Sequence, residues 1–560
     1  MKHVIFILHG YSMKKVWYES IEPVIKSVYP ESDVFFPHLK LSTFSAVDPN
    51  VIVAELLVLV KTKFDQAIAS KGVGAPIPKI IIIGHSTGAV LARKLYVAAC
   101  GENNNAPLES HYNQKTAWDW AFHVDRVILL AGMNRGWTVN AHLYSSTALF
   151  IRIGIIIGRI MTLFGYIPVA FKTRRGAPFI TQLRIQWLSM LRHAEAKGAG
   201  NAPIIQLLGT KDDLISPEDN VDLITGAKFI YLEVPESDHI TVLKMMNDPC
   251  ADKRRAVFER ALCADTNQLQ SMQVAPTDPD FTKIDETVTD VVFVIHGIRD
   301  NGYWTQKVAR RVKAAGDKAG RKFATETSTY GYFAMLPFIL SLERKKKVEW
   351  LMDQYTENLA LYPNAVFSFM GHSNGTYLLA RALKDYPACK FKNVLFAGSV
   401  VQASFDWNEL IEQKRIEKFF NFVASSDYVV AIFPKTFQAL GIQDLGSAGF
   451  DGFTCELSEP YQLRYLPGNH GAGTHEKYWD EIANFIVHGK VSDSLKMMAT
   501  ESRSSFMKVL GSTAPAPFLI ILLFVIALGT GILFLPIAGL IKVLCLAFYS
   551  VCIWKIITWI

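Results

Sequence analysis

IIIIGHSTGAVLARKL, residues 80–95, joins a run of four isoleucines to a helical pattern through a serine between two glycines. A continuous apolar run predicts a strand that is buried on both faces. Gly84 and Gly88 permit a sharp turn at Ser86, which would leave the serine hydroxyl exposed where the strand ends. The stretch therefore predicts a strand, a tight turn with a nucleophilic serine, and a helix whose first N–H groups face any negative charge formed there.

A second stretch of the same kind, VFSFMGHSNGTYLLARAL, spans residues 366–383 and contains Ser373. Each stretch is preceded by an apolar run that ends in His-Gly, VIFILHG in one case and VVFVIHG in the other. His9 and His296 of these two runs are 287 residues apart, as are Ser86 and Ser373. Two motifs at one common offset predict a tandem pair of the same domain.

Short apolar runs alternate with amphipathic stretches in both halves of the chain. The apolar runs include KIIIIG, RVILLAG, APIIQLLG, AVFSFMG, NVLFAG and FFNFVAS, and TQKVARRVKAAG is typical of the stretches between them. This alternation predicts an α/β fold, with a parallel sheet covered by helices on both faces. We expect one unit at residues 1–265 and a second at 289–490, joined by a polar linker with prolines at 266–288.

A serine at neutral pH becomes a nucleophile only with a base beside it, and that base needs an orienting group. After a GxSxG turn these groups follow in the order Ser, Asp, His. In the first half, IIQLLGTKDDLISPED offers Asp212 and Asp213 after a strand, and the GxxDxxI spacing favours Asp212. The next strand, KFIYLEV, leads into PESDHITVL, which contains His239. We predict a triad of Ser86, Asp212 and His239.

The second half offers a matching set. FFNFVASSDYVV places Asp427 after a strand, and two histidines follow the next strand in NHGAGTHEKYWDEIANFI. His475 opens the final helical pattern, as His239 does, so we favour His475 and keep His470 as the alternative. A single aspartate after a strand is commonly a turn or cap residue, so the prediction of Ser373, Asp427 and His475 depends on the ordered set occurring twice.

Both halves resemble α/β-hydrolase fold domains of the serine esterase and lipase type. The resemblance rests on HGY and HGI after the first strand, on GHSTG and GHSNG, and on the later acid and histidine. It implies hydrolysis through an acyl-enzyme, with no metal or organic cofactor, and backbone N–H groups that bind the oxyanion. The residues that correspond to these N–H donors are Tyr11 and Thr87 in the first half, and Ile298 and Asn374 in the second.

The first half carries an insertion at about residues 135–200, where the family often has a cap. It contains TALFIRIGIIIGRIMTLFGYIPVAFKTRR, whose charges before Lys172 are Arg152 and Arg159. The segment either lies in a membrane surface or covers the site as a lipid-binding lid, or it is a cap helix packed closely on its own unit through its glycines. A membrane span is disfavoured, because each arginine would cost about 2.5–3.5 kcal/mol at mid-span.

The C-terminal residues 516–560 predict a membrane anchor of one or two helices. Residues 517–537, PFLIILLFVIALGTGILFLPI, carry no charge and are long enough to cross a bilayer as a helix. Residues 539–560 are apolar except for Lys542 and Lys555, so a second crossing stays open. A tether at 491–515, rich in Ser, Met and Lys, would connect the anchor to the second unit.

The whole-chain composition limits the remaining choices. A net charge of +7 over 560 residues, without a basic cluster that contains aromatics, does not indicate nucleic-acid binding. Seven scattered cysteines and no signal peptide indicate catalytic units on the cytosolic side of a membrane. We therefore expect a membrane-anchored serine hydrolase that cleaves carboxylic esters of lipids. Two alternatives use the same fold: acyl transfer or protein deacylation, and a membrane-tethered binding platform with degenerate triads.

Overall fold

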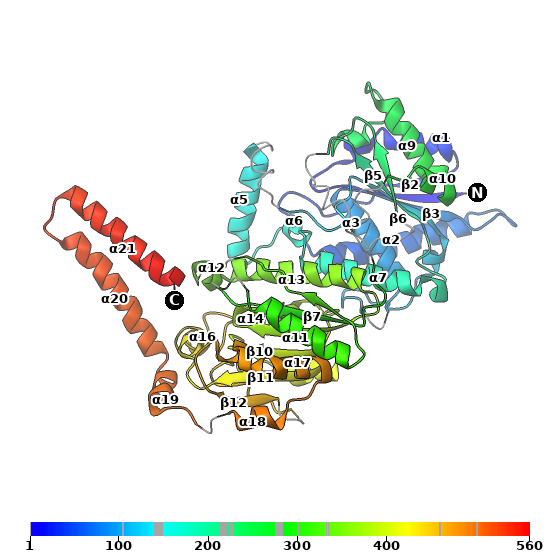
Figure 1. Ribbon diagram of the computed structural model, residues 1–560. Coiled ribbons are helices and arrows are strands. Elements are labelled where there is room, and N and C mark those ends of the chain that lie inside the picture. Colours follow the sequence, from blue (N-terminus) through cyan, green and yellow to red (C-terminus); the bar gives the residue numbers. More distant parts are fainter. Residues whose placement is uncertain are drawn as a thin grey trace. The chain divides into compact units, whose positions relative to one another are not determined.

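The computed structural model describes residues 2–103, 106–138, 149–212, 222, 229–274, 284–298, 300, 302–331, 333, 335–457, 461–499 and 502–559. The chain forms two compact units (Figure 1). Unit 1 is built mainly from Met1–Ile284, and unit 2 mainly from Asp285–Ile560. Each unit has its own sheet, and each is described separately below.

Unit 1 contains a six-stranded sheet in the order β2-β1-β3-β4-β5-β6, and every neighbouring pair is parallel. Its strands are β1 (His3–Leu8), β2 (Asp33–Phe35), β3 (Lys79–His85), β4 (Val124–Leu130), β5 (Ile204–Gly209) and β6 (Phe229–Val234). Its helices are α1 (Ile21–Val28), α2 (Pro49–Ala69), α3 (Thr87–Ala99), α5 (Leu149–Leu163), α6 (Val169–Lys172), α7 (Pro178–Lys197), α9 (Ala251–Cys263) and α10 (Thr266–Ser271).

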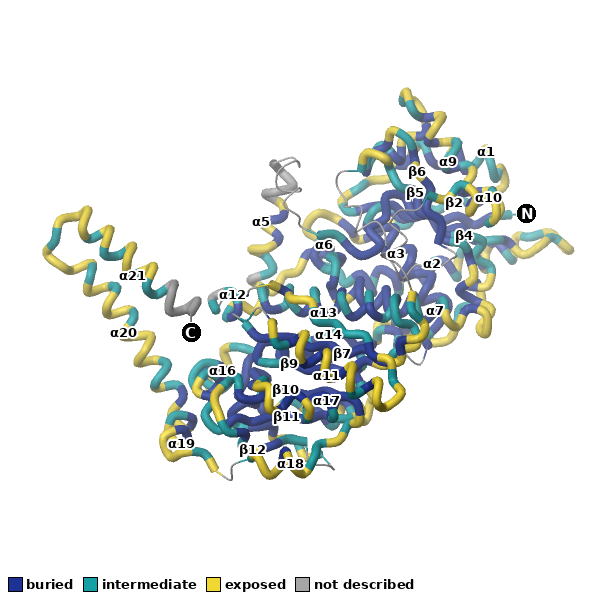
Figure 2. Tube along the Cα trace, in the orientation of Figure 1, coloured by how far each residue is buried: buried dark blue, intermediate teal, exposed yellow. Residues whose placement is uncertain are grey.

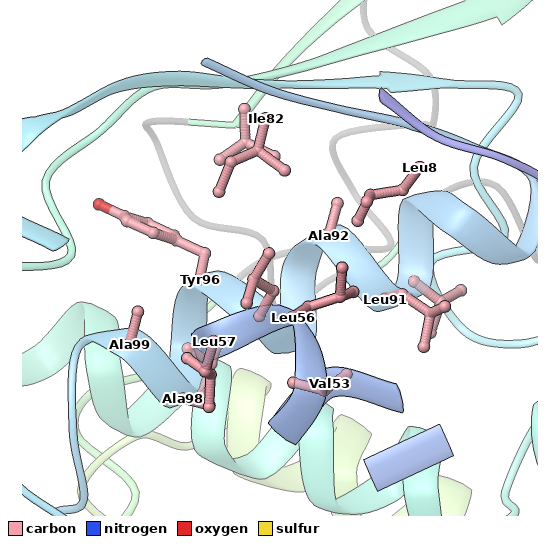
Figure 3. Packing of buried hydrophobic residues seen from close by; sticks show 14 of the residues in the cluster. Leu8, Val53, Leu56, Leu57, Ile82, Leu91, Ala92, Tyr96, Ala98 and Ala99 are labelled. Carbon is pink, nitrogen blue, oxygen red and sulfur yellow. The ribbon is translucent and has the colours of Figure 1, made fainter. Parts of the chain in front are cut away.

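The isoleucine run of β3 has two buried faces because helices cover both sides of the sheet. Ile80 and Ile82 belong to the hydrophobic cluster that α2, α3 and α7 complete. Figure 3 shows Ile82 facing Leu56 of α2 and the side chains of α3. Ile81 and Ile83 point to the opposite face and pack with α1 and α9. Alternate side chains of one strand thus serve two cores, which explains why the strand has no polar face.

Unit 2 repeats this topology. Its sheet has the order β12-β11-β10-β9-β7-β8, also entirely parallel, so its strands follow the same sequence of positions as those of unit 1. Its strands are β7 (Asp290–Ile295), β8 (Phe323–Glu326), β9 (Val366–His372), β10 (Phe391–Ala397), β11 (Ile416–Ala424) and β12 (Gln462–Leu466). The predicted fold class, two tandem α/β units with parallel sheets, is confirmed.

The helices of the second half surround this sheet and then leave it. They are α11 (Thr305–Lys318), α12 (Met335–Ile339), α13 (Ser341–Leu361), α14 (Asn374–Asp385), α15 (Trp407–Glu412), α16 (Tyr428–Leu440), α17 (Trp479–His488), α18 (Asp493–Met497), α19 (Ser505–Ser512), α20 (Pro515–Phe534) and α21 (Gly539–Trp559). The segments expected to be a linker and a tether therefore contain short helices. In the linker, Asp265 and Gln268 form a capping box that starts α10.

The predicted insertion of unit 1 is largely helical and comprises α5, α6 and α7; its residues 139–148 lie outside the described residues. Gly158 of α5 packs closely on α6, since a Cβ there would lie 2.4 Å from the ring of Phe171. A Cβ at Gly154 would have no atom within 4 Å. Ile156 and Ile160 of α5 are exposed. The cap helix is thus packed on its own unit along one side and apolar and exposed along another.

The helix α20 has the properties of a membrane span. Among the described residues it is the one helix long and apolar enough to cross a bilayer, with 20 residues, a mean hydropathy of 2.7 and no buried part. At about 1.5 Å per residue it is about 30 Å long, the thickness of a hydrocarbon core. Helix α21 returns along it, and the Tyr549 hydroxyl donates a hydrogen bond to the carbonyl oxygen of Val525. Figure 2 shows how much of this hairpin is exposed.

A strained turn joins the third strand of each sheet to the following helix. Ser86 has φ 53° and Ser373 has φ 51°, a region that costs a non-glycine residue about 1–3 kcal/mol. The neighbouring glycines allow close backbone contact. A Cβ at Gly88 would lie 2.2 Å from the carbonyl oxygen of Leu8, and one at Gly375 would lie 2.5 Å from that of Ile295. The first strand of each sheet thus touches the turn directly, and only glycine fits there.

We predict that Gly88→Ala destabilises unit 1 by about 3 kcal/mol, because backbone atoms must move apart to admit the methyl group. Its unfolding midpoint should fall by about 6–12 °C. Thermal unfolding of the full chain in detergent, followed by circular dichroism, measures this. Gly154→Ala is the matched control, since its methyl group meets open space and alanine favours a helix. Equal midpoints for the two variants would contradict the prediction.

Candidate active sites

The structure brings Ser86, His239 and Asp212 together at the carboxyl edge of the unit 1 sheet. His239 Nε2 lies 3.0 Å from Ser86 Oγ, and His239 Nδ1 lies 3.0 Å from Asp212 Oδ2. The carboxylate can only accept, so Nδ1 carries the proton and Nε2 accepts from the serine hydroxyl. This is the arrangement in which a histidine removes the proton of an attacking serine.

The loops that carry the acid and the histidine of unit 1 are packed against each other. Asp212 follows β5 and His239 follows β6. A Cβ at Gly209, the last residue of β5, would lie 2.4 Å from the carbonyl oxygen of Ser237. Asp238 accepts hydrogen bonds from the N–H groups of the two residues after His239, at 2.8 and 2.7 Å. The loop is thereby fixed on both sides of the imidazole; Asp213, the other acid, lies outside the described residues.

His85 connects three parts of the unit 1 site. Its Nε2 lies 2.8 Å from the carbonyl oxygen of His239, which can only accept, so this nitrogen carries the proton. Burial lowers the pKa of His85 to about 3, so the ring is neutral and Nδ1 is free to accept. Tyr18 lies 3.1 Å from that Nδ1, and its oxygen accepts from the N–H of Gly10 at 2.7 Å. Sequence reasoning missed Tyr18, for which no motif gives a signal.

The backbone N–H groups expected to bind an oxyanion are free for that role. Thr87 is the first residue of α3, and Tyr11 follows the His-Gly pair after β1. Within the described part of the chain, neither N–H donates a hydrogen bond. The N–H of Ser86 is used differently, since it donates to the carbonyl oxygen of Leu130 at 3.0 Å and so fixes the turn to β4.

In unit 2 the structure pairs Asp427 with His470, not with His475. His470 Nδ1 lies 2.9 Å from Asp427 Oδ2. Asp427 is also the N-cap of α16 and accepts from the N–H of Val430 at 2.9 Å, which orients its carboxylate. His475 lies at the start of a later 3-10 turn. We therefore replace His475 by His470 in the candidate triad.

The position of a histidine relative to the following helix does not identify the residue that pairs with Asp427. The site lies at the sheet edge, so the distance from the end of the last strand decides. His239 lies five residues after Val234 at the end of β6, and His470 lies four residues after Leu466 at the end of β12. A short distance from the strand end is what keeps the imidazole near the serine at the same edge, and His475 is too far along the chain.

The serine of unit 2 and the histidines near it make fewer hydrogen bonds than their counterparts in unit 1. In the described part of the chain, Ser373 Oγ makes no hydrogen bond with His470. His372, the counterpart of His85, lies 3.2 Å from the carbonyl oxygen of His470 through Nε2, and its buried Nδ1 has no partner among the described residues. Burial lowers the pKa of His372 to about 4. The ring that packs edge-on against His372 is that of Trp304, at 6.1 Å, as Tyr18 packs edge-on against His85 at 5.9 Å, but an indole offers no hydroxyl to Nδ1.

The oxyanion residues predicted for unit 2 have different surroundings. Asn374 is fully buried at the start of α14, and its side-chain amide donates to the Tyr330 hydroxyl at 3.1 Å. That hydroxyl donates toward the carbonyl oxygens of His296 and Gly297, at 2.9 and 2.8 Å. The N–H groups of Ile298 and Asn374 donate no hydrogen bond within the described residues. Tyr330 was not predicted, because it lies far from both motifs in the sequence.

No protein-family model matches the sequence, and no curated protein matches it. Solved structures similar to it include a lipase from Bacillus licheniformis, 15% identical over 47% of this chain and 92% of that chain, with a TM-score of 0.29. A siderophore hydrolase from Aspergillus fumigatus is 13% identical over 47% and 88%, with a TM-score of 0.32. A phospholipase from Legionella pneumophila is 14% identical over 48% and 62%, with a TM-score of 0.31. At these TM-scores the likeness carries no argument about activity.

The fold assignment comes from the chain itself. Both sheets have one strand order, both serines lie at a strained turn after the third strand, and an acid and a histidine follow the last two strands. These are the features of the α/β-hydrolase fold that the sequence resembled. The chain therefore contains two tandem units of one parallel α/β fold, each with the serine turn, acid and histidine that the resemblance implied.

We predict that Tyr18→Phe slows ester hydrolysis by unit 1 about tenfold, equivalent to about 1.4 kcal/mol, because two hydrogen bonds that orient the site are lost. The change leaves the Gly10 N–H and His85 Nδ1 without their shared partner. The measurement is kcat for a soluble ester with Ser373→Ala as background. Tyr29→Phe is the matched control, because it removes a partly buried hydroxyl that donates to the carbonyl oxygen of Leu262 at 2.7 Å, away from the site. Equal kcat values would contradict a positioning role.

We predict that His470 activates Ser373 only at a pH above the ordinary histidine pKa of about 6.5. Burial lowers the pKa of His470, but the Asp427 carboxylate raises it by more, so the net shift is upward. His470 is a proton acceptor only when neutral, so reactivity rises with pH through this raised pKa. Fluorophosphonate labelling of Ser373 against pH, with Ser86→Ala as background, measures the midpoint. A midpoint below that of free histidine would refute the Asp427 pairing.

Proposed function

We propose that this protein is a membrane-anchored serine hydrolase that cleaves carboxylic esters, and that unit 1 carries a complete catalytic triad. The observation that carries the proposal is the continuous contact from Ser86 through His239 to Asp212, at a serine held in a strained turn. Maintaining such a turn costs free energy, and strained residues of this kind concentrate at functional sites.

The reaction follows from the direction of each hydrogen bond. Ser86 Oγ attacks the ester carbonyl carbon while His239 Nε2 takes its proton, and Asp212 stabilises the imidazolium. The carbonyl oxygen becomes an oxyanion that accepts from the N–H groups of Tyr11 and Thr87. The C–O bond breaks, the imidazolium gives its proton to the leaving alcohol, and an acyl-serine remains. Water then attacks the acyl carbon and loses a proton to His239, which passes it to Ser86 Oγ as the carboxylic acid leaves.

Unit 2 can perform the same steps with Ser373, His470 and Asp427. Its imidazole already has an oriented carboxylate, but reaction requires the Ser373 hydroxyl to reach Nε2 of His470. Hydrogen bonds of this kind often form fully only when substrate is bound. We therefore assign unit 2 the same reaction class, with a site that tightens on binding.

A lipid ester is the substrate class that the apolar surfaces support. Helix α20 would hold both units at a bilayer. The cap of unit 1 exposes Ile156, Ile160 and Phe164. A helix with an apolar side and arginines suits the interface of a membrane. The free cysteines favour the cytosolic face. Acyl transfer to another acceptor uses the same triad and is separated by analysing products.

Fluorophosphonate labelling of the full chain tests the assignment of both units. Ser86→Ala and Ser373→Ala should each remove part of the label, and the double variant all of it. Loss of a triad residue should lower kcat by about 10⁴-fold or more in the affected unit. His470→Ala should abolish labelling of Ser373, while His475→Ala, the matched control, should not. A folded wild type that takes no label would instead favour a binding platform with degenerate sites.

A further inference from the structure

Four exposed apolar side chains lie on two elements that adjoin α20, the candidate membrane span of unit 2. They belong to α19 and to the C-terminal end of α16, two elements in contact with each other. Phe506 is 72% exposed, Val509 61%, Ile442 62% and Leu440 47%. We call them the anchor-base surface. Scattered apolar residues are ordinary on a protein surface, but a group beside a membrane helix calls for a partner.

The first turns of α20 are packed on α16 of unit 2. The ring of Phe518 lies 5.9 Å from that of Phe433 and 5.8 Å from that of Phe437. Just before α20, the carbonyl oxygen of Ala514 accepts a hydrogen bond from Thr436 at 2.9 Å. Leu440 follows Phe433 and Phe437 at helical spacing, so it lies on the same face of α16 as the contact with the anchor.

Helix α19 is also fixed in orientation. Arg503, just before it, lies over the rings of Phe450 and Tyr465, at 3.7 and 4.3 Å, and donates to the carbonyl oxygens of Ala424 and Phe450. Gly511 packs so closely on Phe450 that a Cβ would lie 2.4 Å from its ring.

Because one face of α19 is packed on unit 2, the opposite face is the one exposed to solvent. Met507 and Gly511 are buried against unit 2, and Phe506 and Val509 are left pointing away from it. Both exposed residues are three apart, so they share one face of the helix. The surface is thus presented by a rigidly held helix and not by a loop.

The bilayer is the partner that this geometry favours. Helix α19 ends at Ser512, three residues before α20 begins, and α20 is just long enough for the hydrocarbon core. Residues this close to the start of a membrane span lie in the headgroup region. An amphipathic helix there buries its apolar side in the boundary between headgroups and acyl chains, with residues such as the exposed Lys508 toward lipid phosphates.

We propose that the anchor-base surface seats unit 2 on the bilayer, so that unit 2 takes its ester from the membrane that holds it. The second clause rests on the proposed function. Helix α16 makes the link, because its N-cap is Asp427 of the candidate triad and its other end belongs to the seat. Helix α12 contacts the returning helix α21, which gives unit 2 a second place of contact with the hairpin.

Photocrosslinking tests the seat without using activity. The full chain is reconstituted in phosphatidylcholine vesicles with p-benzoylphenylalanine in place of Phe506, and in a control in place of Val366, an exposed residue at the start of β9. Lipid adducts at position 506 and none at 366 support the seat. No adduct at position 506, or equal adducts at both positions, overturns it.

Activity tests the substrate clause, with Ser86→Ala as background so that only unit 2 acts. Phe506→Ser with Val509→Ser should lower the rate on a lipid ester in the vesicle about tenfold relative to that on a soluble ester. Val58→Ser with Val73→Ser, two other exposed apolar residues, in unit 1, should leave this ratio unchanged. An unchanged ratio in the first variant overturns the clause. If wild-type protein hydrolyses neither ester, the proposed function fails, and the crosslinking result still decides the seat.

Discussion

A serine held at positive φ between a strand and a helix is the constraint on which each unit depends. The turn fits only if the strand bearing Gly84 and the helix bearing Gly88 approach within backbone contact, and Gly88 in turn touches the carbonyl oxygen of Leu8 at the end of β1. That contact places β1 beside β3 and brings the His-Gly loop next to the serine. The pairing of β1 with β3, the turn at Ser86 and the place of the His-Gly loop thus depend on one close packing.

This dependence explains which parts the sequence could predict. The isoleucine run and the glycines of the turn are local signals, and the acid and histidine of unit 1 follow strands directly, so Ser86, Asp212 and His239 could be found. His470 could not be separated from His475, because two histidines in one loop have equal local chemistry and only the sheet edge distinguishes them. Tyr18 lies on a 3-10 turn without periodicity, so a contact made only through tertiary structure left no trace in the pattern.

The two copies show which parts of the site have changed. In unit 1 both ring nitrogens of His85 have partners, and the Ser86 hydroxyl lies 3.0 Å from His239 Nε2. In unit 2 the buried Nδ1 of His372 has none among the described residues, and leaving such an acceptor unpaired costs about 1–3 kcal/mol. The hydroxyl beside the oxyanion residues comes there from Tyr330, which donates to backbone carbonyls. The site of unit 1 thus has its serine and histidines hydrogen-bonded, whereas the site of unit 2 keeps a buried histidine nitrogen without a partner among the described residues.

The two lysines of α21 are placed near the ends of that helix. Lys542 is in the first turn of α21, and Lys555 is one turn from its end. Thirteen residues of helix separate them, about 20 Å at 1.5 Å per residue. In an α21 that crosses a bilayer, both positions would lie toward the ends of the span, where a charge costs least. The antiparallel contact through Tyr549 and Val525 would return the chain end to the side on which α20 begins. A two-helix anchor would then keep both ends of the hairpin at the face where unit 2 is seated.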